Sequence, residues 1–284
     1  MDCARLWRAE ALAPMFEIEF MRLALVASMA TGASLGVMGV YLVIRRVVFL
    51  GLVVANTATL GAAVTEAIGG PTELMSLVAA VVAAAALGGH SGSNRVSGES
   101  LMGWAYAAAS SLTVLVLAWV TGGSTDTLHL LYGNVLAVQR SDVAGLTIVA
   151  TGVALAQVLF SGRFILVSFD PEAARVAGVH TRGWLLALSL AIGVTAATAV
   201  EAIGALSTFA LLALPSMTAL LVTRSVRSAF ITAAVLGAAV PSLGLVVSFY
   251  LDLPAGPTSV ALLALGVPLA ALIRTVVAPD RDTV

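Results

Sequence analysis

The chain has 284 residues, of which 60% are hydrophobic and 10% carry a charge, and its net charge is −1. That composition excludes a water-soluble globular domain of this length. Apolar runs of about 20 residues recur along the whole sequence, and each is long enough to cross a bilayer. The sequence therefore predicts an all-α polytopic membrane protein, and the single Cys3 excludes an internal disulfide.

The first segment has mixed character, because Trp7 and other apolar residues alternate there with arginines and glutamates. Such a mixture is typical of an interfacial amphipathic segment. A signal peptide is not expected, since the first long apolar run ends at Arg45 and Arg46 without a small-residue cleavage site. We expect an interfacial tail at 1–19, a transmembrane domain at 20–278 and a cytoplasmic tail at 279–284.

Nine stretches have the length and apolar character of membrane spans. They cover residues 21–44, 50–68, 73–89, 101–121, 143–161, 183–202, 204–222, 228–250 and 258–277. Only the region around Gly204 separates the sixth stretch from the seventh. The predicted number of spans is therefore nine, or eight if that pair forms one broken helix.

The arginines between the spans predict the orientation. One set of connectors is rich in arginine, whereas the opposite set has Arg140 alone. The first set holds Arg45, Arg46, Arg95, Arg163, Arg175, Arg182, Arg224, Arg227, Arg274 and Arg281. Because cytoplasmic loops carry the excess of positive residues, we predict the N-terminus outside and the C-terminus in the cytoplasm.

The predicted cytoplasmic loop at 163–182 contains a full set of helix signals. Asp170 suits the N-cap, Pro171 the first helical position, and Glu172 the positive end of the helix dipole. Gly178 then supplies a C-terminal stop. We expect a helix of about two turns that docks a soluble partner. The plainer alternative is a surface helix with a structural role alone.

Five motifs in one uninterrupted order resemble the permease subunit of the metal-uptake ABC transporters, the zinc, manganese and iron family. They are GVYLVIRR at 39–46, HLLYGNVL at 129–136, VSFDPE at 167–172, LALP at 212–215 and YLDLPAGPT at 250–258. Each motif is weak alone, but the five in sequence are specific. The resemblance covers about residues 20–275.

The resemblance implies a bacterial plasma (inner) membrane protein that is not an enzyme and binds no cofactor itself. ATP and magnesium would belong to a cytoplasmic ABC ATPase dimer, and a solute-binding protein would dock outside. The permease would pair as a homodimer, with a heterodimer left open, and no nucleic-acid partner is expected. In the family, the loop helix is the coupling helix that seats in the ATPase. That role falls here on Phe169, Asp170, Pro171, Glu172, Ala174, Arg175 and Gly178.

The chain departs from the family just after the double arginine. The family carries an aspartate and a histidine four residues apart there, and the resemblance implies that such a pair lines the metal path. Here Leu52 replaces the aspartate and Asn56 replaces the histidine. No histidine or cysteine lies in any predicted span, so a tetrahedral zinc site is not expected and no metal ligand is assigned. Oxygen ligands remain, and these suit harder ions such as manganese.

A polar stripe on the second span supplies the candidate transport path. Its members fall within an arc of about 80° when the helix turns by about 100° per residue, and the sixth span adds two more. The candidates are Leu52, Asn56, Thr59, Glu66, Thr198 and Glu201. Buried carboxylates usually face a central cavity, but Glu66 and Glu201 lie near the outer ends of their spans. Simple contact with headgroup water is therefore the alternative for both.

No metalloprotease, phosphate-binding or nucleophile motif is present in the sequence, so an intramembrane enzyme is not expected. The predicted function is the permease subunit of an ABC importer, with divalent metal ions as the substrate class. Two alternatives stay open. One is a permease-like scaffold or regulatory partner of an ABC ATPase that transports nothing. The other is a permease for a non-metal solute, for which an apolar path around Leu52 would be natural.

Overall fold

The computed structural model describes residues 19–89, 96–121 and 140–277, and every regular element in these ranges is a helix. The helices are α2 (Glu19–Ile44), α3 (Val48–Ile68), α4 (Thr72–Gly88), α5 (Gly98–Thr121), α7 (Arg140–Phe169), α8 (Pro171–Val176), α9 (Thr181–Ile203), α10 (Ala205–Val222), α11 (Val226–Leu251) and α12 (Ala255–Val277). The predicted all-α class is confirmed. The predicted N-terminal tail, the 129–136 motif and the C-terminal tail lie outside the described residues, apart from Glu19 at the start of α2.

Eight of these helices are long and apolar enough to span a membrane, and α4 is a shorter apolar helix of 17 residues. Together they correspond to the nine predicted stretches. The sixth and seventh stretches are two helices, because Gly204 takes φ 80° and ψ 162° and ends α9 before α10 begins. Glycine adopts that positive φ without a steric penalty.

One predicted boundary is wrong. The fifth span was expected at 143–161, but α7 continues to Phe169 and is 30 residues long. Residues after 161 are mostly apolar, and the buried Phe164 and Val167 give that extension a face to pack. Proline disfavours helical geometry in the residue before it, so the helix ends where Asp170 precedes Pro171. Arg163 therefore lies on a helix and not in a loop.

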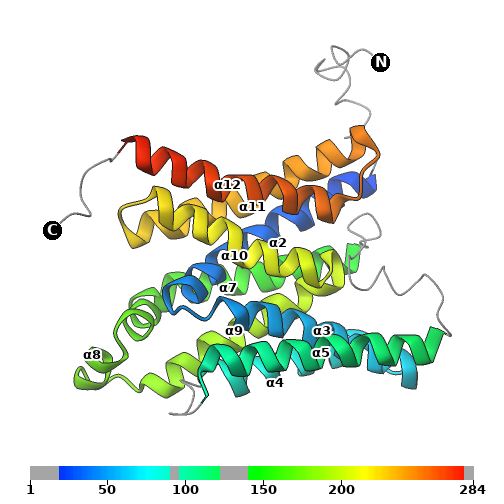
Figure 1. Cartoon of the computed structure of the whole chain (residues 1–284), viewed down its shortest axis with the longest axis horizontal. Helices are drawn as coiled ribbons and strands as arrows, with labels where there is room; N and C mark the ends of the chain where they lie inside the picture. Colours follow the sequence, from blue (N-terminus) through cyan, green and yellow to red (C-terminus); the bar gives the residue numbers. More distant parts are fainter. Residues whose placement is uncertain (1–18, 90–95, 122–139, 278–284) are drawn as a thin grey trace.

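The helices form two groups, which meet through α7 and through direct contacts of α10 with α3 and α9 (Figure 1). The first group packs α2 against α10 and α11, with α12 against the last two. The second group packs α3 against α4, α5 and α9. Helix α7 contacts α2 in the first group and α9 in the second. The consecutive helices α2 and α3 therefore belong to different groups.

Small residues let the backbones of α2 and α11 approach closely. A methyl group added at Gly32 would lie 1.9 Å from the carbonyl oxygen of Gly237, and one at Gly36 would lie 2.5 Å from that of Ala233. No side chain fits at either point. Close contact through small residues is how helices associate in lipid, where no hydrophobic effect drives them together.

The outward face of α5 is apolar and carries tryptophan toward both ends. Trp104 is 67% exposed and Trp119 is 80% exposed. At 1.5 Å per residue they lie about 22 Å apart along the helix axis. Tryptophan is enriched at both interfaces of a bilayer, so this face of α5 suits contact with lipid.

Candidate functional site

Helix α8 has the cap predicted for it. The Asp170 carboxylate accepts hydrogen bonds from the backbone N–H groups of Glu172, at 3.0 Å, and Ala173, at 2.9 Å. At the other end Gly178 takes φ +76°, and its N–H donates to the Arg175 carbonyl at 3.0 Å. The helix is six residues long, which is slightly shorter than the two turns expected.

The loop that contains α8 has a buried face and an exposed face. Ala174 is fully buried, whereas Val176 is 91% exposed and Phe169 is 53% exposed. Glu172 and Arg175 are exposed as well. Figure 1 shows α8 beyond the ends of α7 and α9, at one end of the bundle. An exposed apolar pair beside charged groups is suited to contact with another protein.

An aromatic cluster lies behind this loop and joins four helices. Tyr41 of α2 packs on Phe230 of α11, with ring centroids 4.8 Å apart, and on Phe164 of α7, at 6.1 Å. Phe164 in turn packs on Trp184 of α9 at 5.5 Å. The Tyr41 hydroxyl donates a hydrogen bond of 2.8 Å to Oε1 of Gln157 on α7. The cluster therefore connects both helix groups to the helix that leads into α8.

Arg45, the first residue of the double arginine, reaches across to another helix. Its Nη2 donates to the carbonyl oxygen of Gly88 at the end of α4. A cation at a helix C-terminus is favoured by the helix dipole. Burial nevertheless lowers the pKa of the Arg45 guanidinium, because the charged form loses hydration. The sequence did not predict this contact.

The predicted stripe on α3 lies mostly inside the protomer. Asn56 is 8% exposed and Thr59 is 1% exposed, while Leu52 is half-buried. Nδ2 of Asn56 donates to the Leu52 carbonyl at 3.0 Å, and the Thr59 hydroxyl donates to the Ala55 carbonyl at 3.1 Å. Each side chain thus donates one hydrogen bond within its own helix. The Asn56 amide oxygen and the Thr59 lone pairs remain available as acceptors.

The two carboxylates lie at the ends of their helices, as predicted. Glu66 and Glu201 are both exposed, and the helix ends that carry them lie at the end of the bundle away from α8 (Figure 1). Thr198 is half-buried and donates within α9, to the carbonyls of Val194 at 3.2 Å and Thr195 at 3.1 Å. Across the described ranges, no three His, Cys, Asp or Glu residues gather into a group that could hold a metal ion.

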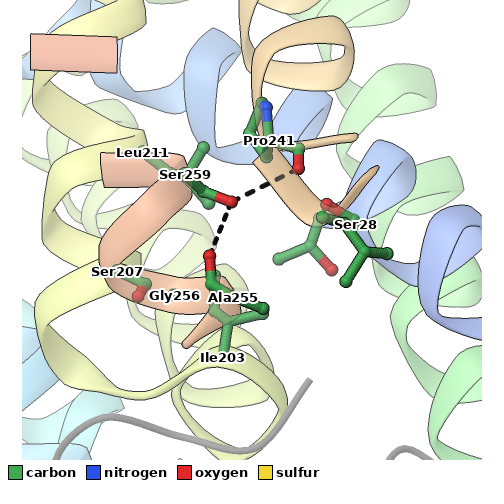
Figure 2. Close-up of a pocket in the computed structure, with 10 residues that line it drawn as sticks. Ser28, Ile203, Ser207, Leu211, Pro241, Ala255, Gly256 and Ser259 are labelled. Atoms are coloured by element: carbon green, nitrogen blue, oxygen red, sulfur yellow. Dashed lines mark hydrogen bonds between the residues drawn. The ribbon is translucent and has the colours of Figure 1, made fainter. Parts of the chain in front are cut away.

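A cavity that the sequence analysis missed lies elsewhere, beside the junction of α9 and α10. Hydroxyl groups from α2, α10 and α12 line it, together with Pro241 of α11 (Figure 2). These residues come from helices far apart in the sequence. No spacing pattern within one helix could have grouped them.

Comparison with known proteins places these features in a family. The model of the ABC 3 transport family matches residues 17–275. The manganese transport system membrane protein MntC of Listeria monocytogenes is 26% identical over 246 residues, which is 87% of this chain and 88% of that protein. The chelated iron transport system membrane protein YfeD of Yersinia pestis is 25% identical over 269 residues, or 94% of this chain and 89% of that protein.

A solved structure has the same fold. The chain superposes on one from PsaBC of Streptococcus pneumoniae in complex with Fab, with a TM-score of 0.82 and 23% identity, over 92% of this chain and 94% of that chain.

Proposed function

Because this chain belongs to the ABC 3 transport family, we propose that it is the membrane-spanning permease subunit of an ABC importer for divalent metal ions. The family match carries the proposal, since it runs over residues 17–275 and so includes α2 through α11 and most of α12. The resemblance drawn from the five motifs is confirmed. The chain is accordingly a multi-pass protein of the bacterial plasma membrane.

ATP hydrolysis belongs to a separate cytoplasmic ABC ATPase dimer in this proposal. Helix α8 is the contact with that ATPase, and its exposed Val176 and Phe169 supply the apolar part of the contact. Because α8 is the connection between α7 and α9, movement of α8 acts on both helices. The aromatic cluster around Phe164 then extends that movement to α2 and α11. A solute-binding protein docks at the opposite end of the bundle.

The names of the relatives and the donor chemistry favour manganese or iron over zinc. MntC is named for manganese and YfeD for chelated iron. The candidate path residues offer oxygen donors alone, from Asn56, Thr59, Glu66 and Glu201. Hard divalent ions accept carboxylate, carbonyl and hydroxyl oxygens, whereas structural zinc sites use histidine and cysteine.

Reconstitution tests this proposal. The permease is placed in proteoliposomes with a candidate ABC ATPase and a candidate solute-binding protein, and ATP turnover and ⁵⁴Mn uptake are measured. We expect manganese-loaded binding protein to stimulate turnover and uptake together. If the ATPase binds the permease but its ATP turnover does not respond to manganese, iron or zinc, metal transport is excluded.

The scaffold alternative has one observation in its favour. Leu52 and Asn56 occupy the positions of the family's aspartate and histidine, so the expected path pair is absent. Docking of the ATPase cannot separate the two functions, because both require it. Substrate-dependent stimulation of ATP turnover separates them, since a scaffold has no substrate to report.

A further inference from the structure

A small cavity lies where α2, α10, α11 and α12 converge (Figure 2). Its volume is about 20 Å³. A cavity needs roughly 10–15 Å³ to hold one water molecule, so there is room for a bound water. Four hydroxyl side chains line it, those of Ser28, Thr31, Ser207 and Ser259.

The Thr31 hydroxyl differs from other buried threonines of the bundle. Thr31 is 2% exposed, and its Oγ1 has no hydrogen-bond partner among the described residues. Six other buried threonines each donate to the carbonyl four residues earlier in their own helix. They are Thr59, Thr65, Thr113, Thr195, Thr208 and Thr218. A buried hydroxyl without a partner costs free energy, so Thr31 requires a partner that occupies the cavity.

The other hydroxyls can complete the coordination of that partner. Ser28 is 7% exposed and Ser207 is 4% exposed, so bulk water does not reach either freely. Ser259 directs its proton toward carbonyl oxygens, at 2.9 Å from Ala255 and 3.3 Å from Pro241, as the dashed lines in Figure 2 show. Its lone pairs are left to accept. A molecule in the cavity can thus accept from Thr31 and donate to Ser259.

Charge excludes a metal ion as this molecule. None of the ten lining residues has an ionisable side chain. The cavity also meets the N-terminal turns of two helices, through Ser207 in α10 and through Ala255 and Gly256 in α12. Helix N-termini carry partial positive charge, which disfavours a cation. A neutral molecule that both donates and accepts is required.

We propose that this cavity binds one ordered water molecule, which links α2 to α10 and α12 through Thr31, Ser28, Ser207 and Ser259. The water satisfies the hydroxyl that α2 leaves unpaired, beside the junction where α9 turns into α10. The proposal stands independently of the transported substrate.

A measurement of the melting temperature tests whether the Thr31 hydroxyl stabilises or destabilises the folded protein. Thr31→Val replaces the hydroxyl by a methyl group of similar size. If a water is bound, the variant of the full-length permease should have a melting temperature about 2–4 °C lower, because a hydrogen bond of typical strength is lost. If the cavity is dry, removal of an unpaired hydroxyl should leave the melting temperature unchanged or raise it, and the proposal fails.

Thr113→Val is the matched control, since Thr113 is 1% exposed and donates to the Ala109 carbonyl at 2.8 Å within α5. It should lower the melting temperature whether or not the cavity is hydrated, which shows that the assay resolves one hydroxyl.

Radiolytic hydroxyl labelling supplies a second and independent measurement. X-rays generate hydroxyl radicals from bound water, so Leu211 and Leu245 beside the cavity should be oxidised more than Leu263, which is comparably buried and does not line it. Equal oxidation of the three leucines would contradict a bound water. The proposal requires both results, and failure of either one overturns it.

Discussion

Asp170 has a defined structural role in the loop that contains α8. Its carboxylate satisfies two N–H groups that would otherwise be unpaired at the start of α8. Asp170→Ala should remove about 1 kcal/mol of support from the helix. We expect roughly fivefold weaker recovery of the ATPase with the purified permease, because about 1.4 kcal/mol corresponds to a tenfold change in an equilibrium.

Asp170→Asn is the matched control for that variant. Asparagine caps a helix as well as aspartate does, so recovery of the ATPase should stay near the parent value. If alanine and asparagine behave alike, the charge of Asp170 and not the cap matters. If neither variant changes recovery or ATP turnover, α8 is not the ATPase contact.

The six path candidates can be tested through charge and through restoration. Glu66→Gln and Glu201→Gln keep the size of the side chain while removing its charge, so each should reduce manganese uptake if the carboxylate faces the path. Leu52→Asp with Asn56→His rebuilds the family pair on the same side of α3. The double variant should gain zinc-stimulated ATP turnover, because an imidazole then joins the oxygen donors.

Two controls make the path experiment decisive. Glu73→Gln removes an exposed carboxylate from the first turn of α4 and should leave uptake unchanged. Thr57→Val removes a hydroxyl of α3 that donates within its own helix and lies outside the stripe. Parent-like uptake in both glutamine variants, together with no zinc response in the restored pair, would rule out a cation path through these residues.

At the scale of elements, the contact between α2 and α7 is the best candidate to transmit a movement of α8 to the rest of the bundle. Tyr41→Phe keeps the ring contacts with Phe164 and Phe230 and removes only the hydrogen bond to Gln157. Removal of this hydrogen bond should cost about 1 kcal/mol of stability. We expect normal recovery of the ATPase but less metal transported per ATP hydrolysed, measured in proteoliposomes.

Tyr106→Phe is the corresponding control, because Tyr106 is 37% exposed on α5. It should change neither docking nor the ratio of transport to hydrolysis. If Tyr41→Phe leaves the ratio of transport to ATP hydrolysis unchanged, the contact between α2 and α7 does not transmit the movement of α8. A loss of ATPase recovery in the same variant would assign Tyr41 to folding of the bundle and not to coupling.

The elements show what the sequence could predict and what it could not. Apolar length alone located the long apolar helices of the described ranges, and the cap at Asp170 was recognisable because its signals are local. The extension of α7 to Phe169 was missed, since burial of Phe164 depends on Tyr41 of α2 and Trp184 of α9, which are distant from it or follow it in the sequence. The hydroxyl-lined cavity was missed for the same reason, because Thr31 and Ser259 meet only in three dimensions.

At the scale of the whole molecule, the two helix groups connect the loop that contains α8 with the helices that carry the candidate path residues. Helix α3, which carries the path stripe, belongs to the group of α9, while α2 belongs to the group of α11. Helix α7 contacts both groups and ends directly at Asp170. A displacement of α8 would therefore reach both groups through α7. This arrangement suits a permease that alternates between two open states.

The orientation in the membrane is the last prediction, and it decides whether α8 can meet a cytoplasmic ATPase at all. Helix α2 begins and α12 ends at opposite ends of the bundle, and α8 lies at the same end as the C-terminal end of α12 (Figure 1). The positive-inside rule places that end in the cytoplasm. Cys3 is first replaced by serine, and one cysteine is then introduced at Ser225, before α11, or at Leu253, before α12; both residues are exposed. In intact cells an impermeant maleimide should label Leu253→Cys and not Ser225→Cys, whereas both should react once the membrane is opened. Labelling of Ser225→Cys alone in intact cells would invert the topology and remove α8 from the compartment that holds ATP.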